Sequence, residues 1–187
     1  MEAILSLAKK SAQQAEVFLT SYEETPVIFE ANRLKQLHTH QGIVLALRII
    51  REGKIGFSTT TRLDDKQTLV DNAVEVSQFG MPARFELPRQ QTYPQVEIYD
   101  PGIEAFTLEQ MIDLAESLLA KVRGHTAELI CDVSITKGIA SVHILNSQGG
   151  EANYSKSFFT IAFEGNLIRD TDMLFVGDSE SSCYLIR

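Results

Sequence analysis

The sequence predicts an α+β fold, an antiparallel β-sheet with about three helices packed on one side of it. Apolar and polar residues alternate with period two in two regions, about 15–60 and 127–176. Apolar residues at helical spacing are concentrated in the middle, at 64–124, with one more short run at the N-terminus. The strands are separated by short turns, which requires antiparallel pairing. Because helices and strands are segregated along the chain, a wound parallel sheet is not expected.

Length and composition are those of one folded globular domain, expected to span residues 1–187. The apolar fraction is 44% and charged residues make up 22%. The formal net charge of −8 argues against nucleic acid as a direct partner, since phosphate binding needs an excess of Lys and Arg. The densest basic cluster, Arg48, Arg51 and Lys54, lies around a predicted turn. No stretch reaches the roughly 20 apolar residues of a membrane span, and no secretory signal opens the chain, so a cytoplasmic protein without a membrane partner is expected.

The first third begins with a predicted helix over residues 2–14, followed by strands. Strand patterns cover 16–22 and 27–30, on either side of Pro26. Ala31-Asn32 supplies a turn into a strand over 34–40, although this dipeptide is a weaker hairpin signal than Asn-Gly.

The clearest strand pair lies at residues 43–60. Apolar residues alternate from Ile43 to Ile49, Glu52-Gly53 makes a two-residue turn, and the chain returns through 54–60. Gly56 inside the returning strand predicts a bulge or the close approach of another backbone.

Two helices are predicted from their caps and stripes. Asp64 is expected to cap a helix that runs to about Phe79, with Gln67 completing a capping box and Gly80 at the C′ position. Its inward face holds Val70, Ala73, Val74 and Ser77. A connection over 81–106, expected on the surface, leads to a second helix. That helix has a capping box of Thr107 and Gln110, an apolar stripe and a stop at Gly124. The stripe is Met111, Ile112, Ala115, Leu118, Leu119 and Val122.

The last third predicts a β-meander. Alternation over 129–135, a turn at Lys137-Gly138 and alternation over 140–144 indicate two strands. A second turn at 146–150 leads into a strand over Tyr154–Glu164 and another over Met173–Val176.

Local catalytic motifs are absent from the sequence. There is no His-Glu-x-x-His, no Gly-x-Ser-x-Gly and no Gly-rich phosphate loop. We therefore expect no catalytic, cofactor-binding or metal-binding residue in this chain.

The histidines do not make a convincing site. His38 and His40 are expected on one face of a strand, where two imidazoles could begin a metal site, but His143 would be needed as a third ligand. Solvent-facing histidines on an edge strand are the favoured interpretation. His125 is expected to interact with a helix C-terminus.

The remaining candidates are also interpreted as structural. The C-terminal carboxylates could bind a hard cation weakly, but a solvated acidic segment is favoured, and the nearby serines are interpreted as flexible surface. Cys131 and Cys183 have no neighbour at metal-site spacing, and Cys131 is expected to be a buried inert thiol. The carboxylates are Asp170, Asp172, Asp178 and Glu180, and the serines are Ser179, Ser181 and Ser182.

These features together resemble the N-terminal region of the TldD/PmbA family, also known as modulators of DNA gyrase. The most specific block is LALRIIREGKIGFSTT at 45–60, followed by the capped helix at 64–79. The other matching segments are AEVFL at 15–19, FEANRLK at 29–35, NSQG at 146–149, YSKS at 154–157 and EGN at 164–166.

The resemblance implies a role in a metalloprotease system. Family members resemble proteases that act as pairs of related subunits and process peptides, including antibiotic precursors and antitoxins. The family's metal motif, His-Glu-x-x-x-His, is carried by one subunit type and lies in a C-terminal domain that this chain is expected to lack. A metal ion, zinc, is therefore implied for the full assembly, while no family ligand maps onto any position here.

Three functional hypotheses follow from the resemblance. The favoured one is an N-terminal domain, not catalytic by itself, that encloses substrate and contacts a subunit of the peptide-processing system. Its expected partners are the complementary TldD/PmbA-type subunit and an unfolded peptide. The second is a stand-alone peptide- or protein-binding regulatory module. The third is indirect modulation of DNA gyrase, because the acidic charge suits a protein partner better than DNA.

Overall fold

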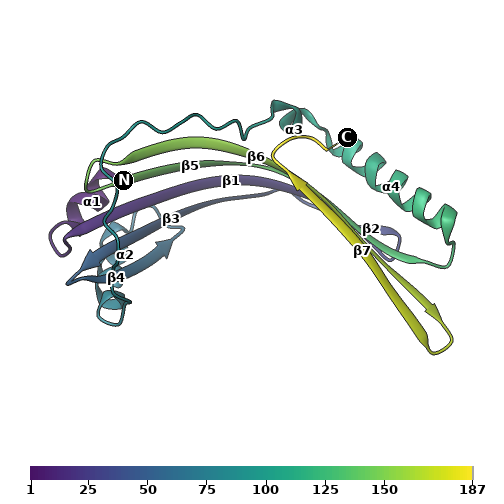
Figure 1. Ribbon diagram of the computed structural model, residues 1–187. Coiled ribbons are helices and arrows are strands. Elements are labelled where there is room, and N and C mark those ends of the chain that lie inside the picture. The colour runs from purple at the N-terminus through teal and green to yellow at the C-terminus, as the bar shows by residue number, and fades with distance from the viewer. Residues whose placement is uncertain (187) are drawn as a thin grey trace. The chain divides into compact units, whose positions relative to one another are not determined.

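The computed structural model describes residues 1–186 and contains one seven-stranded sheet and four helices (Figure 1). The strand order is β4-β3-β1-β5-β6-β7, and β2 pairs with β1 outside this path. The strands are β1 (Gln14–Glu30), β2 (Arg33–Leu37), β3 (His40–Arg51), β4 (Lys54–Thr60), β5 (Ile130–Asn146), β6 (Glu151–Arg169) and β7 (Asp172–Ser182). The helices are α1 (Glu2–Ala8), α2 (Lys66–Ser77), α3 (Pro101–Ala105) and α4 (Leu108–His125). The predicted α+β class with antiparallel strands is confirmed. No helix among the described residues is long and apolar enough to cross a membrane.

The chain forms two compact units, each built from three segments. Unit 1 comprises Met1–Tyr22, Gly42–Val96 and Ser141–Tyr154, and unit 2 comprises Glu23–Gln41, Glu97–Ala140 and Ser155–Arg187. The long strands β1, β5 and β6 each contribute residues to both units.

In unit 1, α1 and α2 pack on residues of β1, β3 and β4. Gly56 explains how closely α2 approaches β4, because a Cβ on this residue would lie 2.1 Å from the Ala73 carbonyl oxygen. The predicted close approach of another backbone at Gly56 is therefore confirmed. The buried residues of this core are Ile4, Leu5, Ala8, Ala15, Val17, Leu45, Leu47, Ile49, Leu69, Val70 and Ala73.

In unit 2, α3 and α4 pack on residues of β1, β5 and β6. The capping box of α4 is present as predicted, with Thr107 Oγ1 accepting from the Gln110 amide and Gln110 Oε1 accepting from the Thr107 amide. The buried residues are Val27, Phe29, Ile103, Met111, Ala115, Leu119, Leu129, Cys131, Val133, Ile135 and Phe159.

Two predicted turns are confirmed by their backbone angles. Ala31 and Asn32 have φ of 49° and 65°, and Glu52 and Gly53 have φ of 52° and 73°. Positive φ at both central residues is the mark of a type I′ hairpin turn.

The predicted turn at Lys137-Gly138 is wrong, because β5 runs unbroken from Ile130 to Asn146. Gly138 instead makes room for its neighbours. A Cβ there would lie 2.2 Å from the Phe158 ring and 2.7 Å from the Glu23 carbonyl oxygen. Sequence alone does not distinguish a glycine that turns the chain from one that admits another side chain.

Helix boundaries also differ from the predictions. The first helix ends at Ala8 rather than at residue 14, since β1 begins at Gln14. Asp65, not Asp64, caps α2, and the Asp65 side chain accepts from the Thr68 amide. Gly80 lies against the Ile55 carbonyl oxygen, where a Cβ would come within 1.9 Å, so close packing explains this glycine.

The C-terminal end of the second predicted helix, and the connection before that helix, also differ from the prediction. Gly124 lies inside the last turn of α4, because the helix runs through to His125. The connection over 81–106 contains one helix that was not predicted. This is α3, which begins after Asp100, whose side chain accepts from the Gly102 amide.

Candidate functional site

The histidines and carboxylates of residues 1–186 make no set of three or more that could hold a metal ion. The described residues therefore do not fit the metal that the resemblance implies for the full assembly. His38 precedes β3 and His40 begins it, so the prediction that both share one face of a strand is wrong. Their exposed rings meet edge-on, 4.8 Å apart between centroids. His143 Nε2 lies 2.9 Å from Glu151 Oε1.

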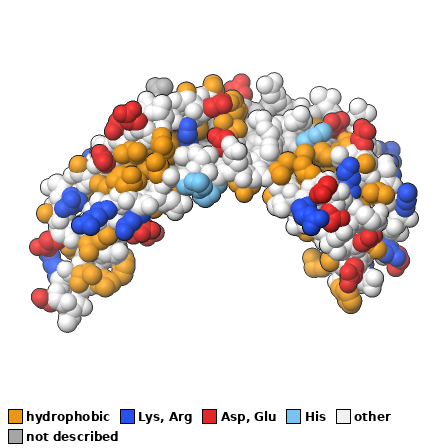
Figure 2. Space-filling model, turned by 180° about the vertical axis from the view of Figure 1, so that it is seen from behind, with side chains coloured by type: hydrophobic (Ala, Val, Ile, Leu, Met, Phe, Trp, Pro, Cys, Tyr) orange, Lys and Arg blue, Asp and Glu red, His pale blue; other side chains and the backbone are white. Residues whose placement is uncertain are grey.

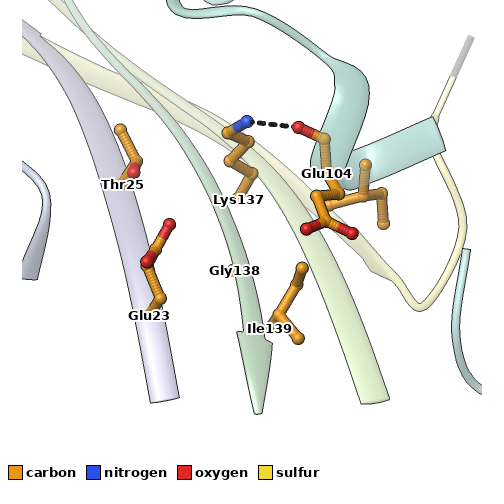
Figure 3. A pocket seen from close by; sticks show the side chains of 7 residues that line it. Glu23, Thr25, Glu104, Lys137, Gly138 and Ile139 are labelled. Atoms are coloured by element: carbon orange, nitrogen blue, oxygen red, sulfur yellow. Dashed lines mark hydrogen bonds between the residues drawn. The ribbon is translucent and has the colours of Figure 1, made fainter. Parts of the chain in front are cut away.

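Unit 2 contains a small cavity of about 40 Å³, and its lining includes Lys137, Glu23 and Glu104 (Figure 3). Lys137 donates from Nζ to the carbonyl oxygens of Glu104 (3.0 Å) and Phe106 (2.6 Å). These carbonyls lie at the C-terminal end of α3, where a cation satisfies unpaired acceptors. Glu23 accepts a hydrogen bond from Gln41. The Lys137 ammonium and the Glu23 carboxylate are thus each hydrogen-bonded to neighbouring groups of unit 2.

The three basic residues singled out by the sequence are each bound by local partners. Arg48 donates to Glu16 at 2.6 Å, and its guanidinium lies 5.2 Å from the centroid of the Phe85 ring. Lys54 donates to the Gln78 carbonyl at 2.8 Å. Arg51 Nε lies 3.5 Å from the carboxylate of its neighbour Glu52. These contacts hold the side chains against unit 1.

Cys131 is fully buried in the core of unit 2, as the alternation predicted. Burial raises the pKa of its thiol, which disfavours the reactive thiolate. Its Sγ contacts the Leu129 carbonyl at 3.8 Å. Cys131 is therefore a core residue.

A further candidate surface is the β6–β7 hairpin, which was predicted only in part and whose exposed apolar residues were not predicted. β7 is an edge strand paired only with β6, and every residue from Asp172 to Ser181 is exposed. Four consecutive apolar residues lie in this exposed strand. Their exposed fractions are 55% for Met173, 56% for Leu174, 68% for Phe175 and 42% for Val176.

The backbone of β7 presents free hydrogen-bonding groups along its outer edge. Arg169 and Asp172 close the hairpin as a directly opposed pair, and in an antiparallel ladder the N–H and C=O groups of successive residues point alternately toward and away from the partner strand. The Ser179 amide donates to Asp178 Oδ1 at 2.8 Å, which places it on the outward side. By this alternation, Met173, Phe175 and Gly177 also point outward. Within residues 1–186, no partner binds their amides.

The two faces of the hairpin differ in chemistry. Phe159 lies in the core of unit 2, and Ile161, Phe163 and Leu167 on the same face of β6 pack against that core. On β7 this face continues with apolar and acidic side chains, while Met173 and Phe175 point to the other face. The residues of β7 on the core face are Asp172, Leu174, Val176, Asp178 and Glu180. Figure 2 shows hydrophobic and acidic side chains next to one another toward the lower left, where the hairpin lies.

The sequence contained a partial signal for this surface. Met173–Val176 was expected as a strand, but the following acidic residues and Ser179, Ser181 and Ser182 were interpreted as solvated, flexible surface. These residues are exposed, as predicted, but they are not an irregular surface segment, because they continue β7 to Ser182 in unbroken register with β6. The available signal was Met173–Val176 itself, a run of four apolar residues that are exposed on the strand and not packed in a core.

Comparison with known proteins gives one matching family profile and one related sequence. Residues 15–77 match the family profile described as PmbA/TldA metallopeptidase domain 1. An uncharacterized protein of Methanocaldococcus jannaschii is 20% identical over 166 residues, which cover 87% of this chain and 38% of that protein.

Solved structures show the same fold. TldE from Thermococcus kodakarensis matches with a TM-score of 0.79 at 13% identity, covering 97% of this chain and 42% of that one. A candidate modulator of DNA gyrase from Bacteroides thetaiotaomicron matches with a TM-score of 0.82 at 18% identity, covering 98% of this chain and 44% of that one. A protein with the same description from Thermotoga maritima gives 0.76 at 16% identity, covering 98% and 42%. The chain thus spans about two fifths of the length of the relatives it matches.

Proposed function

We propose a function for this chain from the premise that it belongs to the TldD/PmbA family, whose first domain its residues 15–77 match. In this proposal the chain is the N-terminal substrate-enclosing and subunit-contact domain of a peptide-processing metalloprotease system. It is not catalytic by itself. Its partners are a complementary subunit of the same family and an unfolded peptide.

The β6–β7 hairpin is the single observation that carries this proposal. Exposed Met173 and Phe175 lie on one face of an edge strand and have unpaired outward amides, and exposed Leu174 lies on the other face. Contiguous exposed apolar surface rimmed by polar residues typically marks a protein interaction site. A free strand edge adds a template for pairing with another chain, which natural proteins normally block. The hairpin therefore has the features of a contact surface.

The bound state of the polar side chains supports a role in contact rather than in chemistry. Lys137 is hydrogen-bonded to two backbone carbonyls, and Arg48 is paired with Glu16. His143 is paired with Glu151. A nucleophile or general base needs a partner arranged around a reacting group, and these contacts serve the fold instead.

The test combines the chain with a metal-motif subunit of the family. We expect the purified chain alone to leave casein intact and the mixture to associate and cleave an unfolded peptide. Replacing Met173 and Phe175 together by serine should weaken association at least about tenfold, because apolar contact area is lost at the interface. Association is measured by sedimentation velocity and cleavage by release of a labelled peptide.

A matched control separates the hairpin from general surface hydrophobicity. Phe79 in unit 1 is 88% exposed, so Phe79→Ser removes a comparable apolar side chain elsewhere. This variant should associate like the unmodified chain. Chelator-sensitive cleavage of casein by the chain alone would overturn the proposed lack of catalysis. Equal association of the hairpin variant would overturn the proposed contact surface.

A further inference from the structure

The outer edge of β7 offers backbone groups that only an extended chain can satisfy. Met173, Phe175 and Gly177 direct their amides and carbonyls outward, at the two-residue repeat of a strand. A helix uses its own backbone groups internally and leaves such an edge unpaired. An added β-strand pairs with each of these positions in turn.

The negative charge around this edge favours a positively charged partner. Residues 164–182 contain five carboxylates and one guanidinium. The guanidinium, on Arg169, lies 3.4 Å from the Glu128 carboxylate. Asp172, Asp178 and Glu180 on β7 form no ion pair within the described part of the chain.

We propose that the free edge of β7 binds an extended, positively charged peptide segment, which joins the sheet as an added strand. This inference rests on the proposed function, because it assigns a substrate class to the same hairpin. A second copy of this chain would bring the same carboxylates to the edge and is disfavoured by like-charge repulsion.

The register of β7 predicts the pattern of the bound segment. Directly opposed residues on neighbouring strands have Cβ atoms about 4.5–5.5 Å apart, close enough for charge pairing and apolar contact. Lysine or arginine is expected opposite Asp178 and Glu180, and again opposite Asp172. Apolar residues are expected opposite Met173–Val176. The Asp178 carboxylate holds the Ser179 amide, so the pairing through backbone groups is centred on 173–177.

The probe is a fluorescent peptide of sequence Lys-Thr-Lys-Ser-Val-Ile-Val-Ile-Lys, whose binding to the full chain is measured by anisotropy at low and high salt. A peptide with glutamate in place of each lysine should bind at least about tenfold more weakly, since several exposed charge pairs each contribute modestly. A peptide N-methylated at alternate residues should lose binding, because it cannot donate to the β7 carbonyls.

A charge swap tests the location. The variant Asp178→Lys/Glu180→Lys changes exposed side chains only and should reverse the preference toward the glutamate peptide. Glu75→Lys, which changes an exposed carboxylate on α2 in unit 1, should keep the lysine preference and serves as the control. Unchanged binding of the N-methylated peptide would overturn strand addition, and equal binding of both charged peptides would overturn charge selection.

The two proposals fail differently. If no peptide binds while Met173→Ser/Phe175→Ser still weakens association with the complementary subunit, the strand-addition inference is wrong and the subunit-contact function stands. If peptides bind as expected while Met173→Ser/Phe175→Ser associates with the subunit as strongly as the unmodified chain, the subunit-contact function is wrong.

Discussion

The strands at the two ends of the main strand order, β4 and β7, differ in how their outer edges are covered. At β4 the outward amide of Ile55 donates to the Met81 carbonyl at 2.9 Å, and the Ala83 amide donates to the Gly53 carbonyl at 2.7 Å. The segment after α2 thus covers the start of this edge. At β7 the corresponding outward amides of Met173 and Phe175 have no partner within residues 1–186.

This difference indicates which edge is available for recognition. Uncovered edges favour aggregation, so a protein gains by covering them or by placing charges on them. β4 uses a covering segment, and β7 uses Asp172, Asp178 and Glu180. A charged edge still accepts a partner of opposite charge, whereas an edge occupied by its own chain does not. The comparison therefore favours β7 over β4 as the place where another chain pairs.

The largest effect on stability is expected when a phenylalanine in the core of unit 2 is compared with one on the exposed hairpin. Phe159 on β6 has no exposed surface, whereas Phe175 on β7 is 68% exposed. Phe159→Ala should lower the free energy of unfolding by about 3–5 kcal/mol, because it leaves a cavity in the core of unit 2. Phe175→Ala should change it by no more than about 0.5 kcal/mol. Urea unfolding followed by circular dichroism measures both. A loss of similar size in the two variants would show that Phe175 is part of the core.

The next effect compares glycines on the two edge strands. Ala at position 56 would place its Cβ 2.1 Å from the Ala73 carbonyl oxygen, so α2 would have to move away from β4. We expect Gly56→Ala to cost about 1–3 kcal/mol of stability through overpacking. A Cβ at Gly177 on β7 would lie 3.0 Å from the Phe163 carbonyl oxygen, which a small shift relieves.

Gly177→Ala is the control for this prediction and should be clearly milder than Gly56→Ala. Both are measured by thermal unfolding at one protein concentration. A Gly177→Ala variant that loses as much stability as Gly56→Ala would mean that β7 is packed as tightly as β4, which contradicts the comparison.

Amide hydrogen exchange tests the covering of each edge without mutation. The Ile55 amide is hydrogen-bonded to Met81, and the Phe175 amide points outward without a partner. Since one net hydrogen bond contributes about 1 kcal/mol, we expect Ile55 to exchange roughly fivefold more slowly than Phe175, after correction for sequence. Addition of the lysine-rich peptide should slow Phe175 and leave Ile55 unchanged. Exchange of Phe175 as slow as that of Ile55 in the free chain would show that β7 is already paired.

The sequence was informative where a local pattern has one physical meaning. The capping box of Thr107 and Gln110 and the turn at Glu52-Gly53 each depend on residues a few positions apart, and both formed as predicted. The predicted turn at Gly138 failed because the reason for that glycine is the Phe158 ring, which alternation alone does not bring into contact. The absence of motifs could be read directly. The hairpin surface could not, because exposure of Met173–Val176 depends on what packs over β7, which is a tertiary property.

The smallest expected effect concerns the chain segment that covers β6 where β7 ends. There the Ser157 amide donates to the Ile98 carbonyl, and the next residue, Tyr99, donates its hydroxyl to the Glu104 carboxylate at 2.6 Å. This hydrogen bond to Glu104 raises the pKa of Tyr99. Because the pKa is higher in the folded state, the contact stabilises the fold below the ordinary tyrosine pKa of about 10 and is lost as pH rises through the raised value.

The free energy of unfolding should therefore fall more steeply in alkaline solution for the unmodified chain than for Tyr99→Phe, in which this titration is absent. Tyr93→Phe, in the same connection, is the control for loss of a tyrosine hydroxyl. Denaturant unfolding across the alkaline range, with phenolate absorbance recorded in parallel, provides the measurement. Identical slopes for the unmodified chain and Tyr99→Phe would mean that the hydroxyl does not bind Glu104 in solution. The covering of β6 would then depend on its backbone contacts, such as that between Ser157 and Ile98.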